Sequence, residues 1–204
     1  MPALRDLADL YRRAKRPEQA ARTWLRCVQV APKDVEARLG LVSALRELGR
    51  TDEAARAAKA AHELDPANGA ASLAFAQVGL RAGDEALRAE AGASAATLLA
   101  GGALKGWLLE DQLALADWQG AHGQADAALA SLNAAAAMDS TSSSVPFQQG
   151  LLELRAGRTA EAAERFARAT VLDPSSSAAH LNLGIARFQG AHVAGIAIKL
   201  SGKA

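Results

Sequence analysis

Histidine is the side chain best suited to bind a metal ion or to transfer protons near neutral pH, and this chain of 204 residues has four histidines. Two histidines four residues apart on a helix can share one ion, but the successive spacings here are 60, 58 and 12 residues. Only His62-Glu63-Leu64-Asp65 resembles a ligand cluster. This segment lies where a helix should end, and the negative end of the helix dipole explains a histidine there more simply. The sequence therefore predicts no metal at His62, His122, His180 or His192.

Nucleophiles are the other candidates for chemistry. Cys27 is the only cysteine, so the chain has no internal disulfide, and the thiol stands at a position that is otherwise alanine. We expect a small buried residue there and not a reactive thiol. The serine runs at residues 142–144 and 175–177 are typical of helix caps. No phosphate-binding glycine loop or nucleophile elbow is found, so we expect a non-catalytic protein without a cofactor.

The charges are balanced overall, with 23 basic and 22 acidic side chains, but they are unevenly distributed. The first 50 residues carry 11 basic and 6 acidic groups, whereas residues 51–150 carry 5 and 12. No basic block is dense enough to predict nucleic-acid binding. No stretch reaches the roughly 18 apolar residues of a membrane helix, so we expect a cytoplasmic protein, or a periplasmic one if a leader was removed.

A repeat of 34 residues organises the chain. Leu64-Asp65-Pro66 recurs as Leu172-Asp173-Pro174, with weaker copies at Val30-Ala31-Pro32 and Met138-Asp139-Ser140. We expect one domain over residues 1–204, with repeats at 1–34, 35–68, 69–102, 109–142 and 143–176, a partial repeat at 177–204 and an insertion at 103–108.

Each repeat has the pattern of two helices joined by a tight turn. A large residue stands beside a small one in the first helix, as in Leu7-Ala8, and a second apolar stripe follows about twelve residues later. Glycines separate the two stripes at Gly49, Gly83, Gly123 and Gly157, where a first helix should end. The small first-helix positions, including Ala116 and Gly184, are expected to be buried, so a tryptophan at either should lower the melting temperature.

These residues make the chain similar to the tetratricopeptide repeat family. The matching positions are Leu7-Ala8, Tyr11, Ala20, Trp24, Cys27 and Pro32 in the first repeat, Leu41, Leu45, Gly49, Ala54, Ala61 and Pro66 in the second, and Gly150, Gly157, Ala162, Phe166, Ala169 and Pro174 in the fifth. The resemblance implies an all-α fold, a right-handed α-solenoid of stacked antiparallel helix hairpins with five repeats and a partial sixth.

Two repeats depart from the pattern. The third has Arg88 where the others keep alanine, and an alternative alignment two residues out of step matches Asp84-Glu85-Ala86 with Asp52-Glu53-Ala54. The partial sixth repeat ends in an apolar segment at 193–200, without the polar face that the last helix of a solenoid needs. Either the chain continues beyond it, or this end associates with something, including a second copy.

In a stack of such hairpins the first helices line the concave side, which is the expected binding surface. We predict that it holds an extended or helical peptide, apolar toward the last repeats and acidic or polar near the first. The expected groove residues are Arg5, Arg12, Leu39, Arg46, Leu73, Gln77, Leu113, Asp117, Phe147, Leu151, Leu181 and Ile185, with Phe188 further along the stripe. The carboxylate clamp by which some family members hold chaperone tails is absent from the matching positions, which hold Arg5, Asp9, Gly40, Ala70 and Ala74.

The leading interpretation is a scaffold or adaptor that binds a protein or peptide partner. Two alternatives stay open at the level of sequence. One is the substrate-selecting arm of a larger glycosyl- or sulfo-transferase, to which the family is sometimes fused. The other is an assembly or export scaffold at a bacterial cell envelope.

Overall fold

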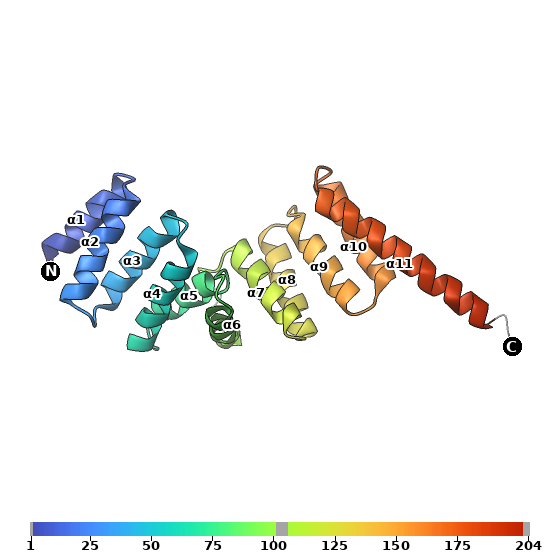
Figure 1. The fold of residues 1–204 in the computed structure, drawn as a ribbon, viewed down its shortest axis with the longest axis horizontal. Helices are drawn as coiled ribbons and strands as arrows, with labels where there is room; N and C mark the ends of the chain where they lie inside the picture. The colour runs from blue at the N-terminus through green and yellow to red at the C-terminus, as the bar shows by residue number, and fades with distance from the viewer. Residues whose placement is uncertain (1, 101–105, 202–204) are drawn as a thin grey trace. The chain divides into compact units, whose positions relative to one another are not determined.

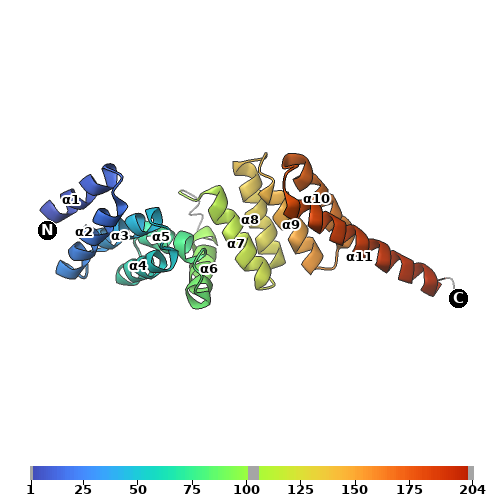
Figure 2. The same cartoon turned by 45° about the horizontal axis from the view of Figure 1, so that its top comes forward.

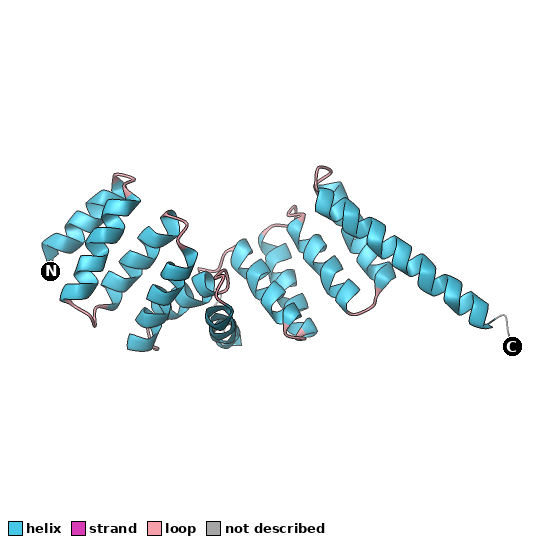
Figure 3. Cartoon of the chain, in the orientation of Figure 1, coloured by secondary structure: helices cyan, strands magenta, loops and turns pink. Residues whose placement is uncertain are grey.

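The computed structural model describes residues 2–100 and 106–201 of the chain, and for residues 193–201 it describes the backbone only. This part of the chain consists of helices and connecting loops without a strand (Figure 3). The helices are α1 (Pro2–Arg13), α2 (Pro17–Val30), α3 (Val35–Glu47), α4 (Thr51–Leu64), α5 (Gly69–Gly79), α6 (Glu85–Ala100), α7 (Leu109–Ala121), α8 (Ala125–Met138), α9 (Ser144–Arg155), α10 (Thr159–Leu172) and α11 (Ser177–Ser201). The expected all-α repeat fold is confirmed.

The helices belong to two compact units, the N-terminal unit Met1–Trp107 with α1 to α6 and the C-terminal unit Leu108–Ala204 with α7 to α11. Within each unit every helix packs on the next one along the chain, and α3 also contacts α5, as α7 contacts α9 (Figures 1 and 2). Odd-numbered helices are therefore the first helices of the repeats. The single continuous domain expected over residues 1–204 stays a prediction.

A left-handed residue closes most of the first helices. Gly49, Gly123 and Gly157 have φ of +69°, +73° and +75°, and in each case the next residue's N–H bonds back to a carbonyl in the last turn of the helix. In the first repeat Lys15 takes the same place with φ +53°. A side chain is strained in this conformation, so Lys15 occupies a position built for glycine.

The third repeat turns differently, and the expected helix end at Gly83 is wrong. Helix α5 already ends at Gly79, and the Gly83 N–H donates to Asp52 Oδ1 at 2.7 Å. Gly79 lies so close to α6 that a Cβ on it would be 2.3 Å from Ala91 Cβ. The first buried residue of α6 is Leu87. The two alternative alignments place the position that is alanine in the other repeats at Arg88 or at Ala86, so Leu87 lies between them.

Large aromatic rings fill spaces that glycines leave. A Cβ on Gly40 would lie 2.4 Å from Trp24 Cε2, and one on Gly150 would lie 2.7 Å from Phe166 Cε1. Trp24 and Phe166 are both buried. In the second repeat the same place on the second helix is taken by an alanine, Ala58, which is also buried. Small residues thus let neighbouring helices approach closely. Gly150 stands at the small position that the repeat pattern predicts, whereas the close approach at Gly40, two residues before that position, was not predicted.

Burial differs from expectation at the last repeat. Cys27 and Ala116 are buried as expected, and burial raises the pKa of the Cys27 thiol. Gly184, however, is exposed, and a Cβ there would meet nothing within 4 Å. The expected burial of Gly184 is therefore wrong, because no helix of the described chain packs on that side of α11. The apolar segment 193–200 lies outside the residues whose side chains are described.

Candidate functional site

Arg5, the first of the expected groove residues, is already engaged within the protein. Its guanidinium forms an ion pair with Asp34, and Asp34 also accepts a hydrogen bond from the Ala37 N–H at 3.1 Å, which caps helix α3. Burial of Asp34 raises its pKa, but the bonds from Arg5 and Ala37 outweigh burial and hold the pKa below its usual value. Arg5 thus links α1 to the residue that caps α3, and it is only partly available to a partner.

The other polar groove residues of the N-terminal unit divide into exposed and buried. Arg12 is exposed and pairs with Asp9 at 3.4 Å, and Arg46 is exposed at the end of α3. Gln77 is only 7% exposed, and its amide donates to the Gly106 carbonyl at 2.8 Å. The expectation that Gln77 lines an open groove is therefore wrong, because the chain at Gly106 covers it.

The two leucines expected in this part of the groove are half-buried. Leu39 is partly covered on α3. Leu73 lies under the same segment as Gln77, since a Cβ on Gly106 would be 2.8 Å from Leu73 Cδ2. Among the expected groove residues of the N-terminal unit, the cations Arg12 and Arg46 are therefore more exposed than the two leucines.

The first helices of the C-terminal unit are more apolar. Leu113 packs on the core around Leu132, and Phe147 stands edge-on to Phe166 with 5.6 Å between ring centroids. Leu151 is half-buried in the same cluster as Phe147. Asp117 is exposed and lies 3.8 Å from the Arg155 guanidinium.

Helix α11 presents the most exposed apolar side chains of this surface. Leu181, Ile185 and Phe188 are 64%, 38% and 75% exposed, and their spacings of four and three place them on one face. We call these three residues the α11 stripe. The sequence-based groove residues therefore form an open apolar surface on α11, flanked on α9 by half-buried ones.

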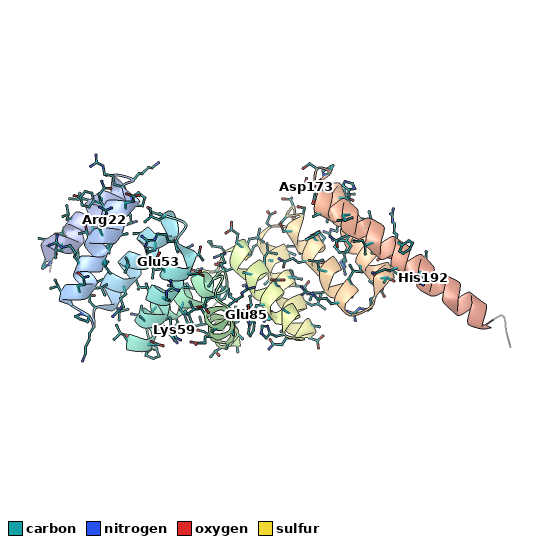
Figure 4. All side chains as sticks on the ribbon, in the orientation of Figure 1. Arg22, Glu53, Lys59, Glu85, Asp173 and His192 are labelled. Atoms are coloured by element: carbon teal, nitrogen blue, oxygen red, sulfur yellow. The ribbon has the colours of Figure 1, made fainter. Side chains whose placement is uncertain are left out.

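Two clefts lie between second helices, away from the predicted groove residues. The α2–α4 cleft has a volume of about 390 Å³ and is lined by Glu18, Arg22, Leu25, Leu45, Arg50 and Glu53. Figure 4 labels Arg22 and Glu53, which stand on its two walls. The α4–α6 cleft has about 570 Å³ and is lined by Lys59, His62, Glu63, Phe75, Glu90 and Leu98, among others. A sequence signal was present, because Lys59 and Glu63 have ion-pair spacing on a helix that already carries His62.

The histidines are separate from one another and mostly engaged. His62 lies in the last turn of α4, as expected, and its Nδ1 is 2.9 Å from Ser72 Oγ. His122 Nδ1 bonds to the Trp118 carbonyl at 2.8 Å, and His180 Nε2 to the Pro174 carbonyl at 3.1 Å. Across residues 2–100 and 106–192 no three His, Cys, Asp or Glu side chains are grouped so that they could hold a metal ion.

The helices of the described chain are also too short or too polar for one of them to cross a membrane. The functional candidates are thus surfaces: the α11 stripe with its α9 neighbours, and the two clefts of the N-terminal unit.

Solved structures share this fold. YrrB, described as a TPR protein with an unusual peptide-binding site, is 20% identical with a TM-score of 0.61, over 82% of this chain and 83% of YrrB. MamA from Desulfovibrio magneticus RS-1 is 19% identical with a TM-score of 0.65, over 86% and 96%. TTC0263 of Thermus thermophilus, a thermophilic TPR protein, is 19% identical with a TM-score of 0.52, over 92% and 98%.

Comparison at the level of sequence gives the family. No curated protein matches the chain. The sequence pattern of the tetratricopeptide repeat matches residues 5–68 and 147–192, which together make up more than half of the chain and include helices of both units. The chain belongs to the tetratricopeptide repeat family.

Proposed function

We propose that the chain is a non-catalytic scaffold that binds an apolar segment of a partner protein on the C-terminal unit, across the α11 stripe and the adjoining first helix α9. Membership of the tetratricopeptide repeat family implies a protein–protein interaction scaffold. That YrrB is described as having a peptide-binding site supports a peptide as the ligand, because it shows that the shared fold can hold one.

The exposure of the α11 stripe carries the proposal. Three large apolar side chains on one helix face are costly to leave in water, and burying their exposed parts gives about 3–5 kcal/mol. Association itself costs at least about 4 kcal/mol, so the stripe alone supports only weak binding. A partner must therefore also reach the half-buried Phe147 and Leu151 on α9.

Polar groups beside this surface give it direction. Asp117 and Arg155 form an exposed pair at 3.8 Å, and Arg187 is exposed on α11. Exposed ion pairs contribute little to stability, so Asp117 and Arg155 can give up their mutual contact and pair with charged groups of a ligand at a small cost in free energy. The polar groups would then set the register of a peptide whose affinity comes from apolar contact.

The test is a peptide selection with matched variants. A displayed library of random peptides is enriched on the wild-type chain and on Phe188→Asp, with Val171→Asp as the control, because Val171 is 78% exposed on α10 and changes charge equally. We expect peptides with two or more large apolar residues that bind wild type and the control and are lost with Phe188→Asp. Equal binding of the selected peptides to all three proteins would refute the site.

Self-association through the same stripe is the second use of this surface, because a second copy could also bury Leu181 and Phe188. Sedimentation over a concentration series distinguishes the two uses. A monomer at tens of micromolar supports the peptide ligand, whereas a dimer that dissociates in Phe188→Asp and not in Val171→Asp assigns the stripe to a second copy.

A further inference from the structure

The α4–α6 cleft in the N-terminal unit is separate from the proposed site on α11, and its floor is apolar. Phe75 is buried beneath it, with the His62 ring stacked at 5.8 Å between centroids and 19° between planes. Leu98 adds an apolar wall from α6. A volume of about 570 Å³ is within the range that small ligands and single side chains with their backbone occupy.

Hydrogen bonds fix the polar character of His62 in this cleft. His62 Nδ1 lies 2.9 Å from Ser72 Oγ, and the same hydroxyl lies 3.2 Å from the Pro66 carbonyl, so the Nδ1 edge of the ring is engaged within the protein. The other ring nitrogen, Nε2, has no hydrogen bond to the described residues. His62 therefore offers a ligand its Nε2 atom for a hydrogen bond.

The ionic groups at the rim favour a cation. Lys59 Nζ lies 2.6 Å from a Glu90 carboxylate oxygen and 3.8 Å from Glu63, so two carboxylates share one ammonium. The hydrogen bond to Glu90 raises the pKa of Lys59, and Asp84 acts in the same direction. Glu63, the more distant carboxylate, is 62% exposed and only weakly compensated.

The α2–α4 cleft does not share this excess of carboxylates. There Arg50 donates from Nε and Nη2 to the two carboxylate oxygens of Glu53, each at 2.6 Å, and Glu18 and Arg22 add one charge of each sign, so the charges of the cleft balance. Figure 4 places Glu53 and Lys59 on the same helix, α4, so one helix contributes to both clefts. Of the two clefts, the α4–α6 cleft alone combines an apolar floor, a histidine nitrogen without a hydrogen bond to the described residues and an excess of carboxylates.

We propose that the α4–α6 cleft binds a peptide segment in which an arginine or lysine stands beside a large apolar residue. The apolar side chain would lie on Phe75 and Leu98, the cation would bind Glu63 at the rim, and a backbone N–H would donate to His62 Nε2. The cleft would thus be a second recognition site of the scaffold, with the opposite charge preference to the arginine-rich surface of α1 and α3.

The probes are three capped tripeptides added to the isotope-labelled full chain. Acetyl-Leu-Arg-Leu-amide carries both features, its citrulline analogue keeps the shape of arginine without the charge, and acetyl-Gly-Arg-Gly-amide keeps the charge without the apolar groups. We expect the first to shift the NMR signals of the His62 and Phe75 side chains. The other two should bind at least about threefold more weakly, which is the scale of one partly exposed ion pair or one partly buried leucine.

Charge-neutral variants locate the site. Glu63→Gln should weaken binding of the arginine peptide about threefold, whereas Glu18→Gln makes the same change in the α2–α4 cleft and should not. Both residues are exposed on helices that tolerate glutamine, so the fold is kept. Equal binding of the arginine and citrulline peptides, an equal loss in both variants, or no shift at His62 and Phe75 at millimolar peptide would each overturn the proposal. Because Phe188→Asp leaves this cleft unchanged, failure here is distinct from failure of the α11 site.

Discussion

Replacement of Gly40 by alanine is the sharpest test of how the repeats stack. In an ordinary helix interior the change stabilises by about 1 kcal/mol, because alanine has the higher helix propensity. Here the new Cβ would lie 2.4 Å from the buried Trp24 ring, well inside any permitted contact. Overpacking of this kind costs about 1–3 kcal/mol, and a contact this short lies toward the upper end.

The two effects oppose each other, so the sign of the result is informative. We expect a net loss of about 1–2 kcal/mol for Gly40→Ala, or a melting temperature lower by about 2–8 °C at this chain length. Gly184→Ala is the matched control, because Gly184 also lies within a first helix but has nothing within 4 Å of a new Cβ. That variant should gain up to about 1 kcal/mol.

The assay is urea unfolding followed by circular dichroism at 222 nm, with tryptophan fluorescence as a second probe. In the background of Trp24→Leu the loss caused by Gly40→Ala should shrink or change sign, because the ring that it strikes is gone. If Gly40→Ala were as stable as Gly184→Ala, the Trp24 ring could not pack against Gly40 of α3. The packing described for the first two repeats would then be refuted.

Three further outcomes are expected. Lys15→Gly should stabilise by about 0.5–1 kcal/mol and Gly49→Ala should destabilise by about 1 kcal/mol in thermal melts, since both residues have positive φ; no difference between them would contradict the left-handed turn. Ala116→Trp should lower the melting temperature by several degrees through overpacking, whereas Gly184→Trp, at an exposed site, should leave it almost unchanged. The folded-state pKa of Asp34 lies below its ordinary value of 3.8, so the charged carboxylate contributes stability that is present above that value and is lost as the pH falls through the folded-state pKa. Asp34→Asn keeps a helix cap but loses the charge, so it should unfold more easily than wild type by up to about 1 kcal/mol at pH 7. Denaturant titrations should show this gap closing as the pH falls below 3.8; a gap independent of pH would rule out the Arg5 pair as its cause.

The candidate site was only partly predictable from sequence. The stripe of Leu181 and Ile185 follows from helical spacing, and the structure places both on one exposed face of α11. The engagement of Arg5 by Asp34, 29 residues away, and the covering of Gln77 by the chain at Gly106 are contacts between distant segments. No pattern within one helix contains them.

The sequence by itself determined what depends on neighbours along the chain. The 34-residue period, the glycines at Gly49, Gly123 and Gly157, and the apolar spacing of each helix specify hairpins, because backbone conformation and helical faces are local properties. Only the tertiary structure decided which face each helix keeps in contact with solvent. Gly150 and Gly184 share one place in the repeat, yet Phe166 covers the first and nothing among the described residues covers the second, because burial is set by what packs there from elsewhere in the chain.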